Sequence, residues 1–216
     1  MKTVLLLAIL LGFGGTLAAA HLVPGIGHAR LPSQTTVVAN GGRSEQFLIR
    51  LPADRIAASD GATAGLRAAT GEGAMLLPAK LASEPLLIEH FKVRDSTGNV
   101  IGVAARHWTT HAGRAATTWS VLVPSRGAFV LSGPGEARGA LETALRAAGY
   151  KAGSEWDGQA IVTMTPAAEP GAFTAGTGEF ADLAGTYTES WTLAGVDESA
   201  QVHGTIELNT TTSRDE

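Results

Sequence analysis

Two residues in neighbouring segments, Glu89 and His107, are the first candidates for chemistry. The hairpin register derived below makes them diagonal neighbours on adjacent strands, about 7 to 8 Å apart between backbones. A buried carboxylate that faces an imidazole forms an ion pair or a general acid–base couple. The alternative, which the sequence favours, is a pair at the end of a barrel that water or backbone groups satisfy.

A second candidate is Glu189, which lies between Tyr187 and Trp191 on one face of a predicted strand. Aromatic side chains bury the largest apolar areas, so we expect this face to point inward and to hold the carboxylate among rings. Such a site binds a ligand amine or hydroxyl, or holds a carboxyl group with a raised pKa. In the alternative, the opposite face lines a polar interior through Thr186, Thr188, Ser190 and Thr192.

Neither a metal nor a cofactor is expected. The chain has no cysteine, which excludes thiolate ligands and disulfides. His107 and His111 are four residues apart, a spacing that shares a face on a helix. On the strand predicted here they lie about 13 Å apart. The glycines of Gly176–Gly178 do not form a phosphate loop, because no helix with a lysine follows them.

The charge distribution argues against a nucleic-acid partner. The formal net charge is -4, and no basic block occurs along the chain. Neutralising phosphates requires clustered lysine and arginine side chains. Arg106, Arg126 and Arg138 form no linear cluster, and we expect them to be solvated.

Residues 1–20 resemble a secretory leader. Lys2 precedes an apolar run, and Ala18–Ala20 provides a small-residue cleavage site before His21. The alternative is an anchor retained through residues 3–20, at the short limit for crossing a bilayer. Both interpretations place the folded part outside the cytoplasm, either periplasmic or secreted. Residues 21–34 read as a linker, residues 35–212 as one β domain and residues 213–216 as a tail.

Residues 86–123 predict a three-stranded antiparallel meander. A turn at Asp95–Gly98 pairs Asp95 with Asn99, and a second turn with Gly113 in the left-handed position pairs Thr110 with Arg114. This register sets Glu89 opposite Ala105 and places His107 on the same face. That shared face is apolar and consists of Phe91, Val93, Ile101, Val103, Trp119 and Val121.

The rest of the chain adds strands and one helix. Helical spacing of Leu141 and Leu145 predicts a helix over 136–148 that ends at Gly149. Further strands are expected at 35–39, 45–51, 128–132, 159–165, 185–193 and 202–210. Residues 54–73 fit a short helix or a long loop equally well. Many antiparallel strands with short turns indicate a closed barrel or a sandwich.

Several motifs resemble the allene oxide cyclases and dirigent proteins. The segment 127–134, preceded by 118–122, resembles the middle strands of allene oxide cyclases. The turn at Gly176–Phe180 is similar to the Gly-Ser/Thr-Gly-x-Phe turn that both groups share, and Gly98–Gly102 fits the strand before these motifs. The resemblance covers residues 86–193.

The resemblance implies a mainly β fold: an antiparallel eight-stranded calycin-like barrel with a hydrophobic lumen, often assembled as trimers. The helix at 136–148 is an insertion relative to the family pattern. The plant cyclases carry a cysteine in the strand that ends here near His107 and Trp108, and this chain has none. Cyclase activity is therefore not implied, because fold transfers between proteins better than function.

The sequence leads to two functional hypotheses. The first is an exported, non-enzymatic barrel that binds an apolar small molecule or serves as an accessory subunit of a membrane complex; homo-oligomers are a further expectation. The second is a cyclase or isomerase that acts on a lipid-like substrate in the lumen, with Glu89, His107 or Glu189 as acid or base. The predicted lumen residues are Glu89, His107, Trp119, Tyr187, Glu189 and Trp191.

Overall fold

A computed structural model describes most of the predicted β domain. The described residues are 35–37, 43–59, 67–68, 86–111, 114–134, 137–151, 154–165, 167–199 and 201–214, and they fall within one compact unit. The predicted leader at 1–20 and the linker at 21–34 lie outside these ranges. Among the described residues, no helix has the length and apolar character needed to span a membrane.

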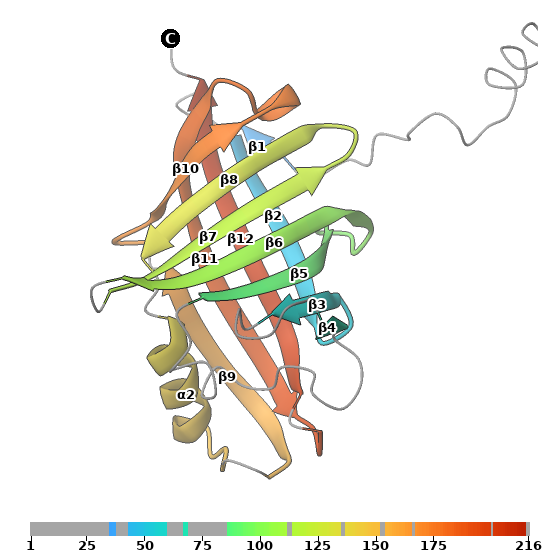
Figure 1. Ribbon diagram of the computed structural model, residues 1–216, viewed down its shortest axis with the longest axis vertical. Helices are drawn as coiled ribbons and strands as arrows, with labels where there is room; N and C mark the ends of the chain where they lie inside the picture. The colour runs from blue at the N-terminus through green and yellow to red at the C-terminus, as the bar shows by residue number, and fades with distance from the viewer. Residues whose placement is uncertain are drawn as a thin grey trace, which may run out of the picture. The chain divides into compact units, whose positions relative to one another are not determined.

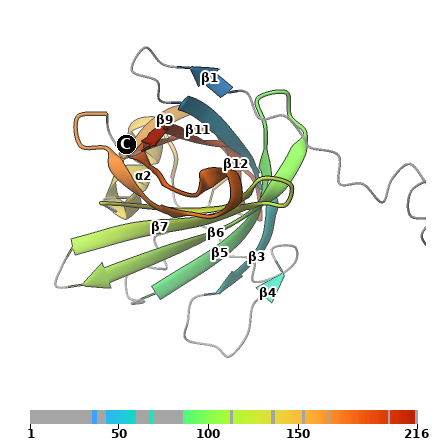
Figure 2. The same cartoon turned by 90° about the horizontal axis from the view of Figure 1, so that it is seen from above.

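Eight strands close into an antiparallel barrel, which confirms the predicted calycin-like architecture (Figures 1 and 2). In ring order they are β2 (Arg43–Leu51), β12 (Val202–Arg214), β11 (Leu183–Val196), β10 (Gly171–Gly176), β8 (Gly127–Pro134), β7 (Arg114–Val123), β6 (Val100–His111) and β5 (Leu86–Arg94). β5 returns to β2 through the pair Arg94–Leu48 and closes the ring. Closure removes the exposed edges that an open sheet would carry.

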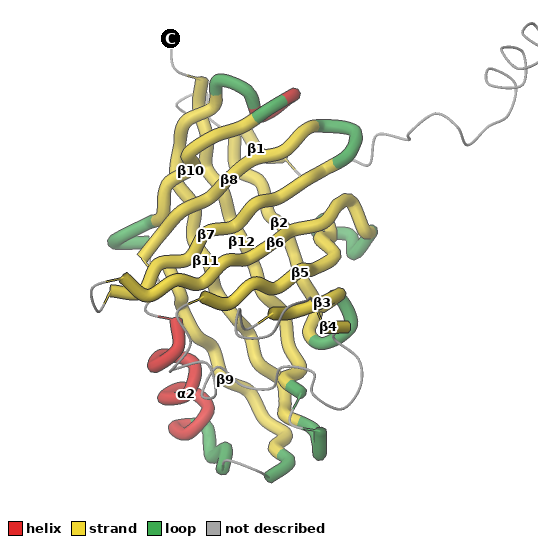
Figure 3. The backbone as a smooth tube through the Cα atoms, in the orientation of Figure 1, coloured by secondary structure: helices red, strands yellow, loops and turns green. Residues whose placement is uncertain are grey.

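The remaining described elements lie on the margins of the ring. β1 (Thr35–Val37) pairs with β2, while β3 (Arg55–Ser59) pairs with β5 and with β4 (Arg67–Ala68). β9 (Trp156–Thr165) extends along β11 beyond the part that pairs with β10. The inserted helix α2 (Ala137–Ala147) lies beside β9, and η2 (Gly178–Phe180) is a short turn (Figure 3).

An ion pair reinforces the point where the ring closes. Asp54 is fully buried and accepts hydrogen bonds from Arg94 Nε at 2.8 Å and from the Arg50 backbone N–H at 2.8 Å. The Lys92 backbone N–H donates to the Asp54 carbonyl at 2.8 Å. Burial raises the pKa of Asp54, but the hydrogen bonds from Arg94 and Arg50 outweigh it and the pKa is lowered. The carboxylate therefore joins the β2–β3 turn to β5.

The predicted register of β5 and β6 is wrong by one residue. The turn itself forms as expected, because the Asp95 backbone N–H donates to the Asn99 carbonyl at 3.0 Å. However, Arg94 pairs with Val100 and Val93 pairs with Gly102, which leaves Ile101 as an extra residue in a β-bulge. Beyond the bulge, the alternation of inward and outward side chains in β6 is reversed.

The second hairpin is also one residue tighter than predicted, because His111 rather than Thr110 pairs with Arg114. The two shifts compensate, so β5 and β7 keep their predicted inward faces and only β6 is inverted. Arg106 therefore faces inward, opposite Trp119, whereas Val103 is 44% exposed instead of buried. The other predicted members of the apolar face are buried: Phe91, Val93, Ile101, Trp119 and Val121.

Candidate functional site

Four charged side chains meet inside the barrel and form what we call the charged cluster: Arg55, Glu89, Arg106 and Glu189. They come from β3, β5, β6 and β11, so the cluster connects strands that are distant in sequence. Buried charges are tolerated when they are paired and hydrogen-bonded. The two arginines and two glutamates meet that requirement with opposite charges in equal number.

Glu89 forms ion pairs with both arginines of the cluster. Arg106 donates to Glu89 Oε2 through Nε at 2.9 Å and also through Nη2, while Arg55 Nη2 lies 3.0 Å from Oε1. Burial raises the pKa of Glu89, but the charges of Arg106 and Arg55 outweigh it and the pKa is lowered. Glu89 is therefore a carboxylate at neutral pH and a poor proton donor.

The Arg106 guanidinium, whose side chain is 1% exposed, is surrounded by aromatic rings. Its central carbon lies 4.3 Å from the ring centre of Trp108, 4.6 Å from that of Trp191 and 5.2 Å from that of Trp119. A fourth ring, that of Phe91, is 5.6 Å away. Arginine suits this setting because its planar, weakly hydrated cation stacks on ring faces.

Glu189 is held mainly by neutral donors. The indole N–H groups of Trp119 and Trp191 each donate to one of its carboxylate oxygens at 2.8 Å. Arg106 Nη1 lies farther away, at 3.5 Å from Oε1. The indoles thus satisfy a buried carboxylate at one edge while their ring faces contact a buried cation.

Tyr187 adds a buried hydroxyl to this part of the interior. Its side chain is 1% exposed, and the Thr165 hydroxyl lies within interaction range of it. Burial and the neighbouring Glu189 carboxylate raise the pKa of Tyr187, so its hydroxyl stays protonated. Neither hydroxyl has a hydrogen bond of normal geometry in the described part of the chain.

The other part of the interior, which we call the aromatic half, is filled by four phenylalanines. Phe129 is central: its ring centre lies 5.1 Å from that of Phe47, 5.2 Å from that of Phe173 and 4.7 Å from that of Phe180. Phe180 belongs to η2 and is 3% exposed, so this turn covers its end of the barrel. We call the part around the charged cluster the charged half.

Arg126 holds η2, the turn that covers the end of the aromatic half, against the barrel. Its Nη2 lies 2.5 Å from Glu45 Oε1 and its Nε 2.8 Å from Glu179 Oε2, while the guanidinium lies over the Phe180 ring at 4.7 Å. The Glu179 backbone N–H also donates to the Arg126 carbonyl at 2.6 Å. These contacts join β2, the β7–β8 turn and η2.

The structure places five of the six predicted lumen residues inside the barrel, each at most 3% exposed: Glu89, Trp119, Tyr187, Glu189 and Trp191. The sixth, His107, is on the opposite face of β6 and half-buried, so the predicted Glu89–His107 couple does not form. The β6 inversion is the reason, since it brings Arg106 to Glu89 instead. The predicted burial of the aromatic face of β11 is confirmed.

Two arginines that we expected to be solvated are buried. Arg106 and Arg126 belong to the two interior assemblies just described, whereas the Arg138 side chain lies outside the described residues. Sequence reasoning also missed Arg55, because residues 54–73 were expected to form a short helix or a long loop, whereas Arg55–Ser59 form the strand β3. Ala104, Arg106 and Trp108 are spaced by two residues and so share one face of a strand. The two apolar members of this set were the signal that could have predicted an inward-facing Arg106.

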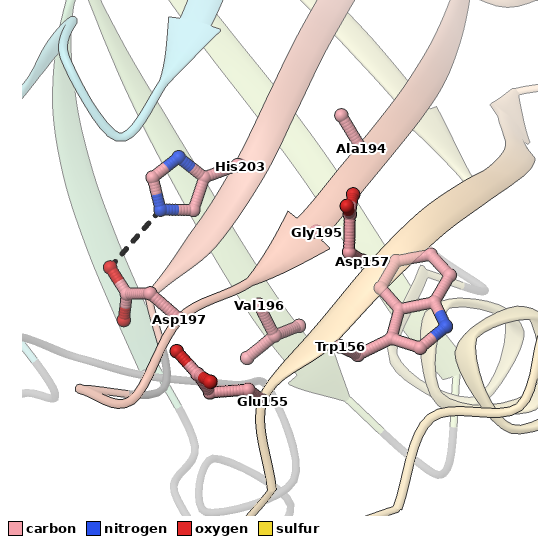
Figure 4. Close-up of a pocket in the computed structure, with 8 residues that line it drawn as sticks. All are labelled: Glu155, Trp156, Asp157, Ala194, Gly195, Val196, Asp197 and His203. Carbon is pink, nitrogen blue, oxygen red and sulfur yellow. Dashed lines mark hydrogen bonds and ion pairs between the residues drawn. The ribbon is translucent and has the colours of Figure 1, made fainter.

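A separate open pocket of about 460 Å³ lies where β9 begins and β11 ends (Figure 4). Trp156 and the carboxylates of Glu155, Asp157 and Asp197 line it, and Asp197 pairs with His203 at 3.0 Å. These carboxylates are solvent-accessible and share no residue with the charged cluster. Within the described ranges, no group of three or more histidine, aspartate or glutamate side chains is arranged to hold a metal ion.

Comparison with known proteins adds no relative. No protein-family model matches the chain, and no curated protein matches it significantly.

Proposed function

We propose that the chain is an exported, non-enzymatic barrel protein that binds an apolar small molecule in the charged half of its interior. The observation that carries the proposal is the pairing of Arg106 with both glutamates inside a wall of indole rings. Because the cluster is balanced in charge, a ligand beside it meets aromatic side chains and no uncompensated ion. Ligand sites of this kind combine apolar walls with a few polar groups.

The alternative is a cyclase or isomerase that uses the lumen, and it requires a group that gives or takes a proton. Glu89 is held as a carboxylate by two arginines, and His107 faces away from the interior. Glu189 already accepts two indole N–H groups. These arrangements favour binding over acid–base chemistry.

The kinship with allene oxide cyclases and dirigent proteins is also a proposal, supported by the quoted motifs. One of them forms a turn that requires glycine. Gly178 has a φ of +63°, and a side chain there would collide with the Arg126 carbonyl, so the turn that carries Phe180 depends on it. This supports a shared turn design and no particular activity.

A fluorescent probe tests the binding proposal. N-phenyl-1-naphthylamine is neutral and apolar, and it brightens when it leaves water. We expect saturable binding of one probe per chain, accompanied by quenching of tryptophan emission, because Trp119 and Trp191 line the site. Absence of saturable binding to the folded protein would overturn the proposal.

Export is proposed from the leader-like residues 1–20 and is tested by intact mass and membrane partitioning in the native host. Soluble protein with the mass of residues 21–216 supports a free exported barrel. Full-length protein that only detergent extracts supports the anchored form. Full-length protein in the cytoplasmic fraction contradicts export.

A second candidate function, assembly into a larger complex or a homo-oligomer, is favoured by the outer face of the barrel. Val103 and Leu122 are cross-strand partners on that face, and they are 44% and 46% exposed. Adjacent exposed apolar side chains mark interaction surfaces when they form a patch. Sedimentation of the wild type and of a Val103→Ser/Leu122→Ser variant tests this candidate: an assembly that the variant loses supports it, and a wild-type monomer excludes self-association.

A further inference from the structure

The buried hydroxyls of Tyr187 and Thr165 share an unmet hydrogen-bonding capacity. Both residues are 1% exposed, and neither oxygen has a hydrogen bond of normal geometry among the described residues. Buried polar groups in folded proteins almost always have partners, so each exception requires an explanation. Here two exceptions lie side by side.

Proton counting shows that the pair cannot satisfy itself. Each hydroxyl carries one O–H donor and can also accept. If Tyr187 and Thr165 shift slightly and bond to each other, one O–H is used and the other still lacks an acceptor. A third group that accepts a hydrogen bond is needed to complete the set.

The barrel wall holds the phenol in place. A Cβ atom added to Gly133 would lie 2.7 Å from the Tyr187 hydroxyl oxygen, and one added to Gly171 would collide with the ring. The ring therefore lies directly against the backbone of β8 and β10. This packing prevents the hydroxyl from swinging away to another acceptor.

The surrounding charges select the kind of acceptor. The Glu189 carboxylate and the Arg106 guanidinium, which both act on Tyr187, already pair with each other, so neither is left to compensate the charge of a ligand carboxylate, phosphate or ammonium group. A neutral oxygen needs no ionic partner and can accept the free O–H of the pair, and the aromatic side chains of this half suit an apolar body.

We propose that Tyr187 and Thr165 are the polar anchor of the ligand site and donate a hydrogen bond to a neutral oxygen, a carbonyl or hydroxyl, of an otherwise apolar molecule. This inference rests on the proposed binding function and specifies its ligand class.

Displacement of N-phenyl-1-naphthylamine by a matched naphthalene series tests the anchor. The series consists of 2-acetylnaphthalene, 2-ethylnaphthalene, 2-naphthoate and 2-naphthylmethylamine, which differ mainly in the polar group. We expect the ketone to displace the probe at about tenfold lower concentration than the ethyl compound. The anion and the cation should both be weaker than the ketone.

Three variants assign this preference to the hydroxyls. Tyr187→Phe and Thr165→Val each leave one O–H donor, so each should keep part of the ketone preference, while the double variant Tyr187→Phe/Thr165→Val should bring the ketone and ethyl compounds to within about twofold of each other. Tyr150→Phe is the matched control, because it removes the hydroxyl of a buried tyrosine outside the eight barrel strands. Circular dichroism checks that each variant is folded. If the double variant does not fold, the fall in preference in the two single variants decides the question.

The outcomes separate the two proposals. If the wild type binds the probe but shows no preference for the ketone, or if the folded double variant keeps the full preference, the anchor is wrong and the binding function stands. If the wild type binds no probe, the binding function itself fails. A preference that is reduced in both single variants, lost in the double variant and unchanged in Tyr150→Phe supports the anchor.

Discussion

The two halves of the barrel interior solve the same packing problem with different chemistry. The aromatic half is filled by four phenylalanines and is covered by η2, with charge confined to Arg126 and its partners at the end. The charged half holds two arginines and two glutamates at its centre and places tryptophans around them. Apolar side chains are stabilised when their shapes pack closely together. A buried ion pair is stable only while each charged group keeps its partner. The halves should therefore respond differently to mutation, pH and ligand.

Removal of Arg106 is expected to have the largest effect. Arg106→Met keeps much of the side-chain volume but leaves Glu189 without a nearby cation and Glu89 with Arg55 alone. We expect the free energy of unfolding to fall by about 3–5 kcal/mol, as when one partner of a buried ion pair is removed. Urea denaturation measures it, with the exposed Lys92→Met as control. A loss below about 1 kcal/mol would mean that the cluster is not fully desolvated.

The matching test in the aromatic half is Phe129→Ala. Phe129 is 1% exposed and contacts three other rings, so its truncation removes buried apolar area and leaves a cavity. We expect a loss of about 3–4 kcal/mol in the same denaturation experiment. Unlike that of Arg106→Met, this loss should not vary between pH 4 and pH 7. A strong pH dependence would contradict the apolar description of this half.

Substitution of Arg126, which holds η2 over the end of the aromatic half, should lower the free energy of unfolding less than the two substitutions above. Arg126→Met breaks the ion pairs with Glu45 and Glu179 but retains an apolar stem over Phe180. Because the Glu179 side chain is 27% exposed and can turn to solvent, we expect a loss of about 1–2 kcal/mol. Hydrogen exchange should localise the effect to residues 176–180. Uniform acceleration across the barrel would contradict a role confined to the cover.

Acid should weaken the charged half selectively. The folded-state pKa of Glu89 is lowered below that of the unfolded chain, so its ionised form stabilises the fold above the unfolded pKa, about 4.3. This contribution is lost as the pH falls through the lower, folded pKa. Glu89→Gln should therefore reduce the slope of unfolding free energy against pH below about pH 4.3, by at most about 1.4 kcal/mol per pH unit. If the slope is unchanged, the loss of stability in acid comes from other carboxylates, such as Asp54.

The smallest effect is expected from His107→Ala. His107 is half-buried on the outer face of β6, away from both interior assemblies. Thermal and urea unfolding should change by no more than about 0.5 kcal/mol, which is typical of surface substitutions. A loss comparable to that of Arg106→Met would contradict the β6 register and restore the His107–Glu89 pairing.

Several features could be predicted from the sequence because they depend on local pattern. Alternation in β5, β7 and β11 identified which face is buried, and aromatic area correctly placed Tyr187 and Trp191 inside. The spacing of Leu141 and Leu145 predicted α2 within one residue at each end. These patterns are local, so no knowledge of distant contacts was needed.

Only the tertiary structure decided which charges meet. A single extra residue at Ile101 inverts β6, and neither turn sequence distinguishes that bulged register from the regular one. The inversion exchanges His107 for Arg106 inside the barrel. Ring closure brings Glu189 to Arg106, and the pairing of β3 with β5 brings Arg55 to Glu89. The sequence by itself determined the strands, their apolar faces and the helix, since these follow from local periodicity. The charged cluster and the pair of unmet hydroxyls depend on the register and on closure, which are set by contacts between residues far apart along the chain.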